Sequence, residues 1–439
     1  MKLPFETFAR NRSDVWSTRT LVSTRALFCM AMTVASGCSN SSPLICDGVP
    51  SDPSGCATDG PVVACTTDDE CAPQVCDVAG TQTCVECTAD KAAACTGTSP
   101  ICGDDLACRG CSAHTECPDS NACLPDGSCA APDDVAYVAA GQAGNCDKAT
   151  PCGTLTEGVA KGRPFVKASG AINDATTVVI SRAVTVLADS ATSVNVTADN
   201  VPVLSVATSN ADVAIYDLTV TGGTMNAGKG IDLPNGGTPK LALTRVKVDS
   251  NQGGGISSSG GSLTVSQSTL SGNQGGGISV TGNTTFDITN NFIFRNGDQD
   301  NGAFGGVNLG VAVAAGSRLE FNTIVDNRAA AGATRAGGTI CDIAGFVAAN
   351  NLIARNTVAG NANAVNSQTL GVCSYPTSKI QSDLAGLLFE ESETSPFDYH
   401  VQAGSSVIDQ ATTSSAVLVD VDGDGRPAGA QKDIGADEL

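Results

Sequence analysis

The chain has 439 residues, a net charge of −21 and 20 cysteines, and only 4% of its residues are aromatic. Its length exceeds that of one ordinary globular domain, so we expect at least two regions. The negative charge excludes nucleic acid as a partner, because phosphate binding needs clustered Lys and Arg side chains. The cysteines crowd into the first third of the chain, which indicates an oxidising compartment outside the cytosol.

Residues 1–37 have the composition of an export signal. Basic residues precede the apolar run ALFCMAMTVASGC, which ends at Cys38. The run is too short to span a bilayer and has the length of a signal peptide. Its end, Ala35-Ser36-Gly37-Cys38, resembles the lipobox of bacterial lipoproteins, with Ala35 at the position where that family usually has Leu.

The lipobox resemblance implies that Cys38 carries a lipid, which anchors the chain to a membrane without a transmembrane helix. Ser39 stands where an Asp would retain such a protein at the inner membrane, so the resemblance implies the outer membrane and the cell surface. The alternative is cleavage by the ordinary signal peptidase near the same position.

Residues 38–132 form a cysteine-rich region with few large apolar residues. Cys65–Cys84 and Cys111–Cys129 share the opening C-x5-C and two further cysteines, which indicates a degenerate repeat. Exported units that cannot build a core are held by disulfides, so we expect a disulfide-stapled stalk. Cys84-x2-Cys87 with Cys108-x2-Cys111 has the spacing of a zinc site, but the exported context and the lack of a His pair favour disulfides. The region is similar to the cysteine-rich spacers of surface lipoproteins in myxobacteria-like bacteria.

Residues 133–439 contain an internal repeat. The stretch NQGGGIS occurs at Asn251–Ser257 and again at Asn273–Ser279, with an apolar residue three positions before each asparagine. The same register continues along the chain at intervals of 22 to 31 residues, at Gly223, Asn251, Asn273, Asn296, Asn327 and Asn356. Apolar and polar residues alternate before several of these positions, so we expect about three short strands per repeat and no helix.

Asn or Gly at the register position predicts a sharp turn in each repeat, since these residues tolerate a left-handed backbone. Stacked asparagine side chains can also form a hydrogen-bonded ladder. We therefore expect Ile293 to be buried and Asn296 to lie at a corner with a positive φ or a stacked side chain. The triple glycine is expected at a second corner rather than around a nucleotide, because no Gly-Lys-Ser/Thr follows it.

Three strands per repeat and an asparagine ladder resemble the right-handed parallel β-helix of the pectate lyase-like fold. We therefore predict an all-β chain in which residues 133–439 form a right-handed parallel β-helix (solenoid) behind the small disulfide-rich region. A single coil cannot bury its apolar face, so many coils must stack. Thr154-x-x-Glu157 is a capping box, which predicts an N-terminal capping helix on the first coil. We expect Cys146 and Cys152 to form a disulfide in the preceding loop.

The C-terminal sequence resembles the choice-of-anchor Q β-helix domain of bacterial surface proteins. The phrases that carry the resemblance are NNLIARNT, DYHVQAGSSVIDQ, DVDGDGRP and DIGADE. The resemblance implies surface display and specifies no reaction. Cys341 and Cys373 are about one long coil apart, so stacking places them within the Cα separation of a disulfide, roughly 4.4–6.8 Å, and we expect them to pair.

Asp420, Asp422 and Asp424 form the D-x-D-x-D-G opening of a calcium loop, in which alternate carboxylates converge on one ion. Gln431 stands where an EF-hand has its Glu, so Ca²⁺ would require an irregular loop. The alternative is an acidic closing turn that Arg426 partly neutralises.

Catalytic candidates in the repeat region are few. Arg295 with Asp298 and Asp300 is the best local cluster for a lyase, and His400 in the closing motif is expected to be structural. We therefore predict a cell-surface lipoprotein whose β-helix is a structural or adhesive module, with carbohydrate as a candidate ligand. The alternative is a carbohydrate-active β-helix enzyme, either a polysaccharide lyase or a glycoside hydrolase. A groove lined by Arg or Lys beside several Asp would favour the enzyme, and a smooth polar face would favour the adhesin.

Overall fold

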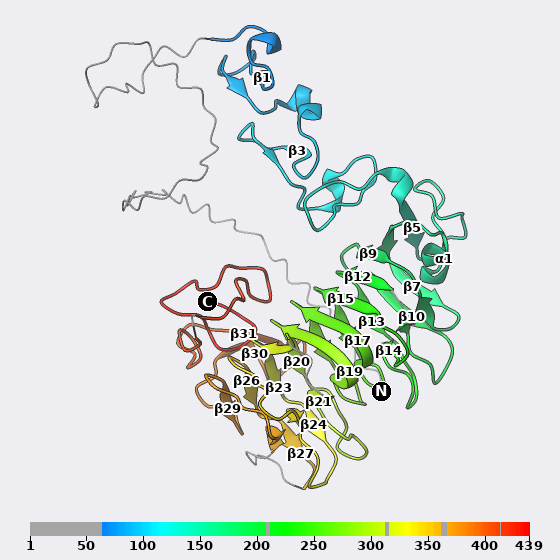
Figure 1. Ribbon diagram of the computed structural model, residues 1–439, viewed down its shortest axis with the longest axis vertical. Coiled ribbons are helices and arrows are strands. Elements are labelled where there is room, and N and C mark those ends of the chain that lie inside the picture. The colour runs from blue at the N-terminus through cyan, green and yellow to red at the C-terminus, as the bar shows by residue number, and fades with distance from the viewer. Residues whose placement is uncertain (1–63, 208–210, 312–315, 361–366, 413) are drawn as a thin grey trace, which may run out of the picture. The chain divides into compact units, whose positions relative to one another are not determined.

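The computed structural model describes residues 64–207, 211–311, 316–360, 367–412 and 414–439 (Figure 1). Cys38, the predicted lipidation site, lies outside these residues. None of the helices in the described part of the chain is long and apolar enough to cross a membrane. The described chain is an all-β, right-handed parallel solenoid of about nine coils that follows a disulfide-rich segment.

The disulfide-rich segment contains three small units, one more than the spacing indicated. In each unit the first cysteine pairs with the third and the second with the fourth, giving Cys65–Cys76 and Cys71–Cys84, Cys87–Cys102 and Cys95–Cys108, and Cys111–Cys123 and Cys117–Cys129. The middle unit was missed because it opens with C-x7-C instead of C-x5-C. The four cysteines with zinc-like spacing are all engaged in these disulfides.

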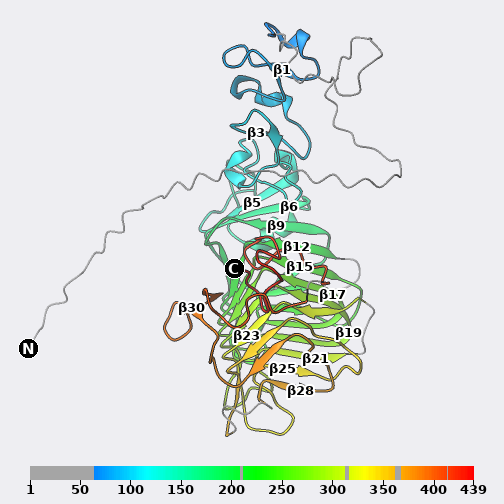
Figure 2. The same ribbon diagram turned by 90° about the vertical axis from the view of Figure 1, so that its left-hand side faces the viewer.

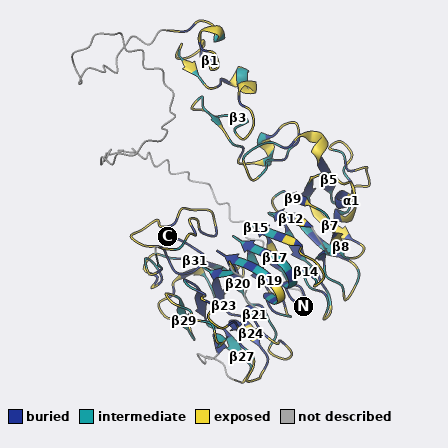
Figure 3. Ribbon diagram, in the orientation of Figure 1, coloured by how far each residue is buried: buried dark blue, intermediate teal, exposed yellow. Residues whose placement is uncertain are grey.

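The helices and strands of this segment are short, and most of its residues are exposed or only partly buried (Figure 3). Its paired strands are β1 (Val75–Cys76) with β2 (Cys84–Val85) and β3 (Ile101–Cys102) with β4 (Cys108–Arg109). Its 3-10 helices are η1 (Asp68–Glu70), η2 (Ala89–Ala94) and η3 (His114–Glu116), and η4 (Pro132–Asp134) leads into the solenoid. Because so little apolar surface is buried here, the disulfides must supply most of the stability, typically about 2–4 kcal/mol each.

The helix α1 (Leu155–Ala160) closes the first coil of the solenoid. The Thr154 hydroxyl accepts a hydrogen bond from the Glu157 N–H at 3.2 Å, and the Glu157 carboxylate accepts one from the Thr154 N–H at 3.1 Å. Leu155 and Val159 are buried on the side of α1 that faces the core. The capping box and the capping helix are therefore present as predicted.

Two parallel sheets form the walls of the solenoid (Figures 1 and 2). The nine-stranded sheet has one strand per coil, in the order β7 (Ala171–Asp174), β10 (Ser193–Val196), β13 (Thr219–Thr221), β16 (Lys247–Asp249), β18 (Thr269–Ser271), β20 (Phe292–Phe294), β23 (Thr323–Val325), β26 (Leu352–Ala354) and β29 (Lys379–Gln381).

The 14-stranded sheet covers the other sides of each coil. Its main path consists of β5 (Val135–Ala139), β6 (Phe165–Ser169), β9 (Val184–Ala188), β12 (Asp212–Tyr216), β15 (Lys240–Thr244), β17 (Ile256–Ser266), β19 (Ile278–Thr289), β21 (Val307–Val311), β25 (Thr339–Cys341) and β28 (Thr369–Gly371). Beside this path lie β8 (Val178–Ile180), β11 (Leu204–Val206), β14 (Ile231–Leu233) and β22 (Arg318–Glu320). A short separate pair joins β24 (Arg328–Ala329) to β27 (Thr357–Val358).

Apolar residues at equivalent positions of successive coils stack into inward columns. In the nine-stranded sheet one column consists of Val220, Val248, Leu270, Ile293, Ile324 and Ile353, all of them buried. Ile293 has no exposed surface, which confirms the register predicted from the repeat.

An asparagine ladder runs along one corner of the coils. Each asparagine donates both its backbone N–H and a side-chain N–H to the side-chain oxygen of the next, through Asn251, Asn273, Asn296, Asn327 and Asn356 to Gln368. Gly223, at the start of the predicted register, donates its N–H to the Asn251 side chain at 2.9 Å. The ladder therefore satisfies backbone groups that the turn leaves without a strand partner.

The left-handed residue at this corner is the one before each asparagine, so Asn296 itself is stacked and its predecessor makes the turn. These predecessors have φ between 50° and 65° and are Ser250, Gly272, Arg295, Asp326 and Arg355. A second ladder, missed in the sequence, consists of Ser268, Asn291, Asn322, Asn351 and Ser378. It was hidden because serines stand at both of its ends.

The repeated GGG stretches lie where neighbouring coils approach each other closely. A Cβ atom on Gly255 would lie 2.5 Å from the carbonyl oxygen of Gly277, and one on Gly277 would lie 2.5 Å from that of Gly306. The central residues Gly254 and Gly276 have φ of 115° and 102°, which side chains disfavour. NQGGGIS therefore occurs twice because two successive coils make the same close turn.

Two disulfides staple the solenoid. Cys146 and Cys152 are bonded in the loop before α1, with Cα atoms 4.4 Å apart. Cys341, at the end of β25, is bonded to Cys373 one coil later, with Cα atoms 5.7 Å apart. Both are the pairings expected from the sequence.

Replacing Asn296 by Ala should lower the free energy of unfolding by more than about 2 kcal/mol, because it leaves buried donors and acceptors in both neighbouring coils without partners. The matched control is Asn283→Ala, at an exposed position of β19, which should change stability by less than about 0.5 kcal/mol. Denaturant unfolding of both variants with disulfides intact measures the difference. Equal stability of the two variants would contradict a stabilising ladder.

Candidate functional site

After the last coil the chain folds back over the outer face of the nine-stranded sheet. The return hairpin, β30 (Phe389–Glu391) with β31 (Asp398–Val401), and the C-terminal segment, residues 411–412 and 414–439, form this cover. The Gln267 and Asn290 side chains donate to the carbonyl oxygens of Asp420 at 3.1 Å and Val419 at 2.8 Å.

The cover explains why β20, β23 and β26 are apolar on both faces. Their outward residues Phe292, Val325 and Leu352 are buried. They pack in one cluster with residues of the cover that include Tyr399, Val401, Val421 and Ile434. A strand covered on both faces loses the alternation of apolar and polar residues. The sequence FIF at Phe292–Phe294 is one result.

The closing motif of the sequence forms the interior of the cover. The guanidinium of Arg426 lies 2.8 Å from the Glu438 carboxylate, and both side chains are fully buried. Arg426 also donates to the carbonyl oxygens of Asp433 and Gly435 and lies 4.6 Å from the centre of the Phe321 ring. Burial lowers the pKa of Arg426, and the negative charge of the Glu438 carboxylate opposes this shift.

The aspartates of the predicted calcium loop are not gathered around one point. Asp420 accepts hydrogen bonds from the N–H groups of Asp422 at 3.0 Å, Asp424 at 2.8 Å and Glu438 at 3.1 Å. Its carboxylate is thus occupied by the closing turn. The carboxylate of Asp422 lies 3.0 Å from Nε2 of His400 and groups with His400 and Asp437.

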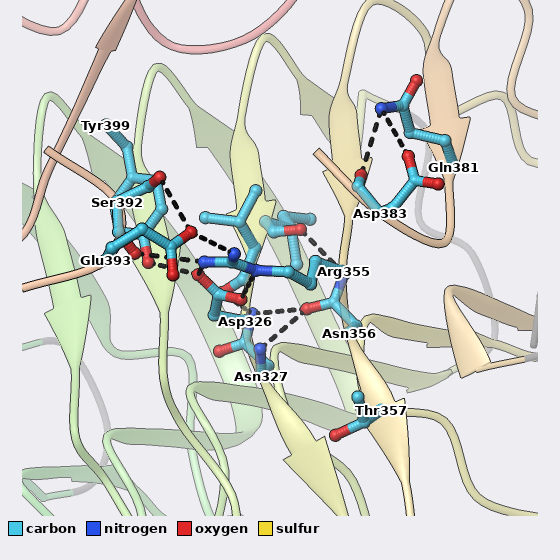
Figure 4. Close-up of polar contacts among 12 residues, drawn as sticks. Asp326, Asn327, Arg355, Asn356, Thr357, Gln381, Asp383, Ser392, Glu393 and Tyr399 are labelled. Atoms are coloured by element: carbon cyan, nitrogen blue, oxygen red, sulfur yellow. Dashed lines mark hydrogen bonds and ion pairs between the residues drawn. The ribbon is translucent and has the colours of Figure 1, made fainter. Parts of the chain in front are cut away.

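Arg355 joins the return hairpin to the ladder corner (Figure 4). Its guanidinium forms a bidentate pair with Asp326, bonds Glu393 and donates to the carbonyl oxygen of Ser392 at 3.0 Å. The Tyr399 hydroxyl donates to the same Asp326 carboxylate. The hydrogen bonds to Asp326 raise the pKa of Arg355, and burial beside Asp326 raises that of Tyr399. These fully paired groups hold the hairpin in place and leave no free base or acid.

A groove of about 510 Å³ lies between the nine-stranded sheet and residues 395–397 of the return hairpin. Three of its lining residues are cationic, namely Lys247, Arg295 and Arg328, and it also contains Asp249, Phe294 and Phe397. The Arg295 guanidinium lies 3.8 Å from the centre of the Phe397 ring. Within the described part of the chain, neither Arg295 nor Arg328 forms an ion pair with a carboxylate.

The sequence singled out Arg295, but with partners that the structure does not place in the groove. Asp298 and Asp300 belong to a loop turn in which the Asp298 carboxylate accepts the Asp300 N–H at 2.9 Å. The carboxylate that does line the groove is Asp249, which lies 3.8 Å from the Lys247 ammonium group. The groove is therefore cationic with one acidic residue, rather than a cluster of acids beside one Arg.

Lys247 and Arg328 were missed because each is unremarkable in its own repeat. The available signal was positional, since Arg295 directly precedes ladder residue Asn296 and Arg328 directly follows ladder residue Asn327. Stacked coils bring such flanking positions to one side of the solenoid.

A second cavity of about 290 Å³ contains His400 and Asp422 and shares Lys247 with the groove. The His400 ring is hydrogen-bonded at Nδ1 by Asp398 and packs edge-to-face on Phe292, with ring centres 4.9 Å apart. Burial opposes the positive charge of His400, but Asp398 and the neighbouring aspartates outweigh it and raise its pKa. Burial raises the pKa of the nearby Asp437 to about 6.

The match to a family model agrees with the fold. A family model described as a right-handed beta helix region matches residues 190–384. The solved structure of pectate lyase Pel9A is similar at a TM-score of 0.42 and 13% sequence identity, over 69% of this chain and 96% of that chain. A search of curated proteins found no match to this sequence.

Replacing Glu438 by Gln should lower the free energy of unfolding by about 3–5 kcal/mol, because it leaves the buried Arg426 charge without its counterion. Chemical denaturation without reductant measures this loss. Glu390→Gln, at an exposed position of β30, is the matched control and should change stability by less than about 0.5 kcal/mol. A Glu438→Gln variant as stable as the control would show that the pair does not hold the cover.

Proposed function

We propose that this chain is an outer-surface lipoprotein whose β-helix binds an acidic polysaccharide in the cationic groove. The observation that carries the proposal is that Arg295 and Arg328 have no carboxylate partner among the described residues, although the chain has a net charge of −21. In so acidic a protein, most Arg side chains at the surface can find a carboxylate. Two that lack one beside Lys247 favour an anionic ligand.

The spacing of the cations suits a linear polyanion. Lys247 is on β16, Arg295 follows β20 two coils later, and Arg328 is one coil further. Because coils stack at about 4.8 Å, a chain lying along the solenoid axis would meet the cations in succession. A guanidinium can bind a carboxylate through two parallel hydrogen bonds, so uronate residues fit this arrangement.

The aromatic residues of the groove give the ligand an apolar wall. Phe294 and Phe397 both line it, and sugar rings can pack their apolar faces on such side chains. The negative charge elsewhere on the chain would repel an acidic polymer, so we expect binding to be confined to the groove and to weaken with salt.

The groove also supports a second candidate function, β-elimination of the bound uronate. Lys247 and Arg295 are the residue types that act as the base in such lyases, and both line the groove. Hydrolysis is less suited, because a glycosidase needs two carboxylates flanking the bond and Asp249 is the one acidic residue among the described lining residues. Ultraviolet absorbance of the unsaturated product, with polygalacturonate as substrate, separates a lyase from a binding module.

The anchored state rests on the sequence alone. The basic leader, the short apolar run and the lipobox-like Ala35–Cys38 support lipid attachment at Cys38. The disulfide-linked units after it agree with an oxidising location outside the cytosol. A stalk of such units would hold the groove away from the membrane.

Arg295→Gln and Arg328→Gln should each weaken binding of polygalacturonate at least tenfold, since a hydrogen bond to a charged group contributes about 1.5–3 kcal/mol. The matched control is Arg318→Gln, which removes the same charge from an Arg that is paired with Asp287. Calorimetric titration at two salt concentrations, with neutral dextran as a second ligand, measures the effect. Equal loss in all three variants, or equal binding of dextran, would contradict the groove as the binding site.

Cys38→Ala should release the protein from the cell membrane without changing its fold, because it removes the acceptor of the lipid. Metabolic labelling with palmitate and fractionation of cells and medium measure the change. Cys29→Ala, in the apolar run itself, is the control and should stay anchored. Label on a Cys38→Ala protein would refute lipidation at this residue.

A further inference from the structure

We propose that His400, Asp422 and Asp437 bind one divalent transition-metal ion, and that this ion fastens the C-terminal segment to the return hairpin. His400 is on β31, whereas Asp422 and Asp437 belong to the C-terminal segment. The donor atoms of the three side chains all lie within 4.8 Å of one another. Small side-chain rotations would bring all of them to the ligand distance of such an ion, about 2.0–2.2 Å.

His400 is oriented as a metal ligand usually is. Its Nδ1 is held by the Asp398 carboxylate, which leaves Nε2 as the ring nitrogen available to an ion. A carboxylate on the remote ring nitrogen is the common outer partner of a ligating histidine. The Nε2 atom lies 3.0 Å from a carboxylate oxygen of Asp422, but without hydrogen-bond geometry, and it is buried with no hydrogen-bond partner among the described residues.

Asp437 supplies a buried carboxylate that has a hydrogen-bond donor but no paired cation among the described residues. Its side chain is buried, and one oxygen accepts the Val401 N–H at 2.6 Å. No cationic side chain in the described chain pairs with it. A buried carboxylate is costly without a counterion, and a metal ion would provide one. Asp422 is half exposed, so the site opens to solvent on its side.

The cationic residues around the cavity do not fill this role. Arg245 lines it but is bound to Asp217 at 2.7 Å, and Lys247 lies nearest to Asp249 at 3.8 Å. The charges that face His400 are therefore mainly those of aspartates.

The donor set selects the class of ion. One imidazole nitrogen with two carboxylates suits Zn²⁺ and related first-row ions, whereas Ca²⁺ takes six to eight oxygen ligands. Asp422 thus belongs to a metal site different from the predicted calcium loop. Its two partner ligands, His400 and Asp437, lie outside that loop and are brought to it by the tertiary structure. The inference does not depend on polysaccharide binding, although Lys247 places the ion beside the groove.

Calorimetric titration of the full chain with Zn²⁺ tests the site. The protein is first alkylated without reduction, so that any free thiol cannot bind the ion. The chain has two histidines, His114 and His400, so His114→Gln serves as the control for His400→Gln. We expect one Zn²⁺ site in the wild type, at least tenfold weaker binding in His400→Gln, and unchanged binding in His114→Gln.

Asp422→Asn provides a second variant at a half-exposed position where misfolding is not expected. It should also weaken binding at least tenfold, and Zn²⁺ should raise the melting temperature of the wild type by several degrees but not that of either variant. Wild-type affinity in both His400→Gln and Asp422→Asn would overturn the site. Tighter binding of Ca²⁺ than of Zn²⁺ would overturn the assignment of the ion class.

Discussion

The rest of this structure depends on the hydrogen bonding of each coil to the next. No coil can bury its own apolar residues, so columns such as the one through Ile293 form only when coils stack in register. The asparagine ladders keep that register at the corners, where strand pairing ends and the backbone would otherwise lose partners. A left-handed residue before each asparagine lets the chain turn.

Stacking also creates a difficulty that the C-terminal segment solves. The outer face of the nine-stranded sheet is apolar at β20, β23 and β26, and it must be covered. The return hairpin and the closing motif cover it through the buried Arg426–Glu438 pair and the Arg355–Asp326 pair. The acidic phrases of the C-terminal sequence therefore work mainly as parts of this cover.

Both candidate sites lie at the boundary between sheet and cover. The cationic groove has a floor from the coils and a wall that includes Phe397 of the hairpin, and the metal site joins His400 to two aspartates of the C-terminal segment. In both places the coils supply part of the lining, whereas the irregular cover supplies Phe397 and all three metal ligands. This is the usual division between a rigid repeat and the segments that carry specificity.

The sequence by itself determined the features that recur from coil to coil. The period, the buried Ile293, the ladder through Asn296 and the Cys341–Cys373 disulfide all follow from stacking equivalent positions, which is a local rule. Only the tertiary structure decided where the return hairpin and the C-terminal segment lie, and with them the wall that Phe397 gives the groove and the meeting of His400 with Asp422 and Asp437. These contacts join segments that share no repeat, so no periodicity in the sequence could specify them; the packing of a long non-repetitive segment on a sheet did.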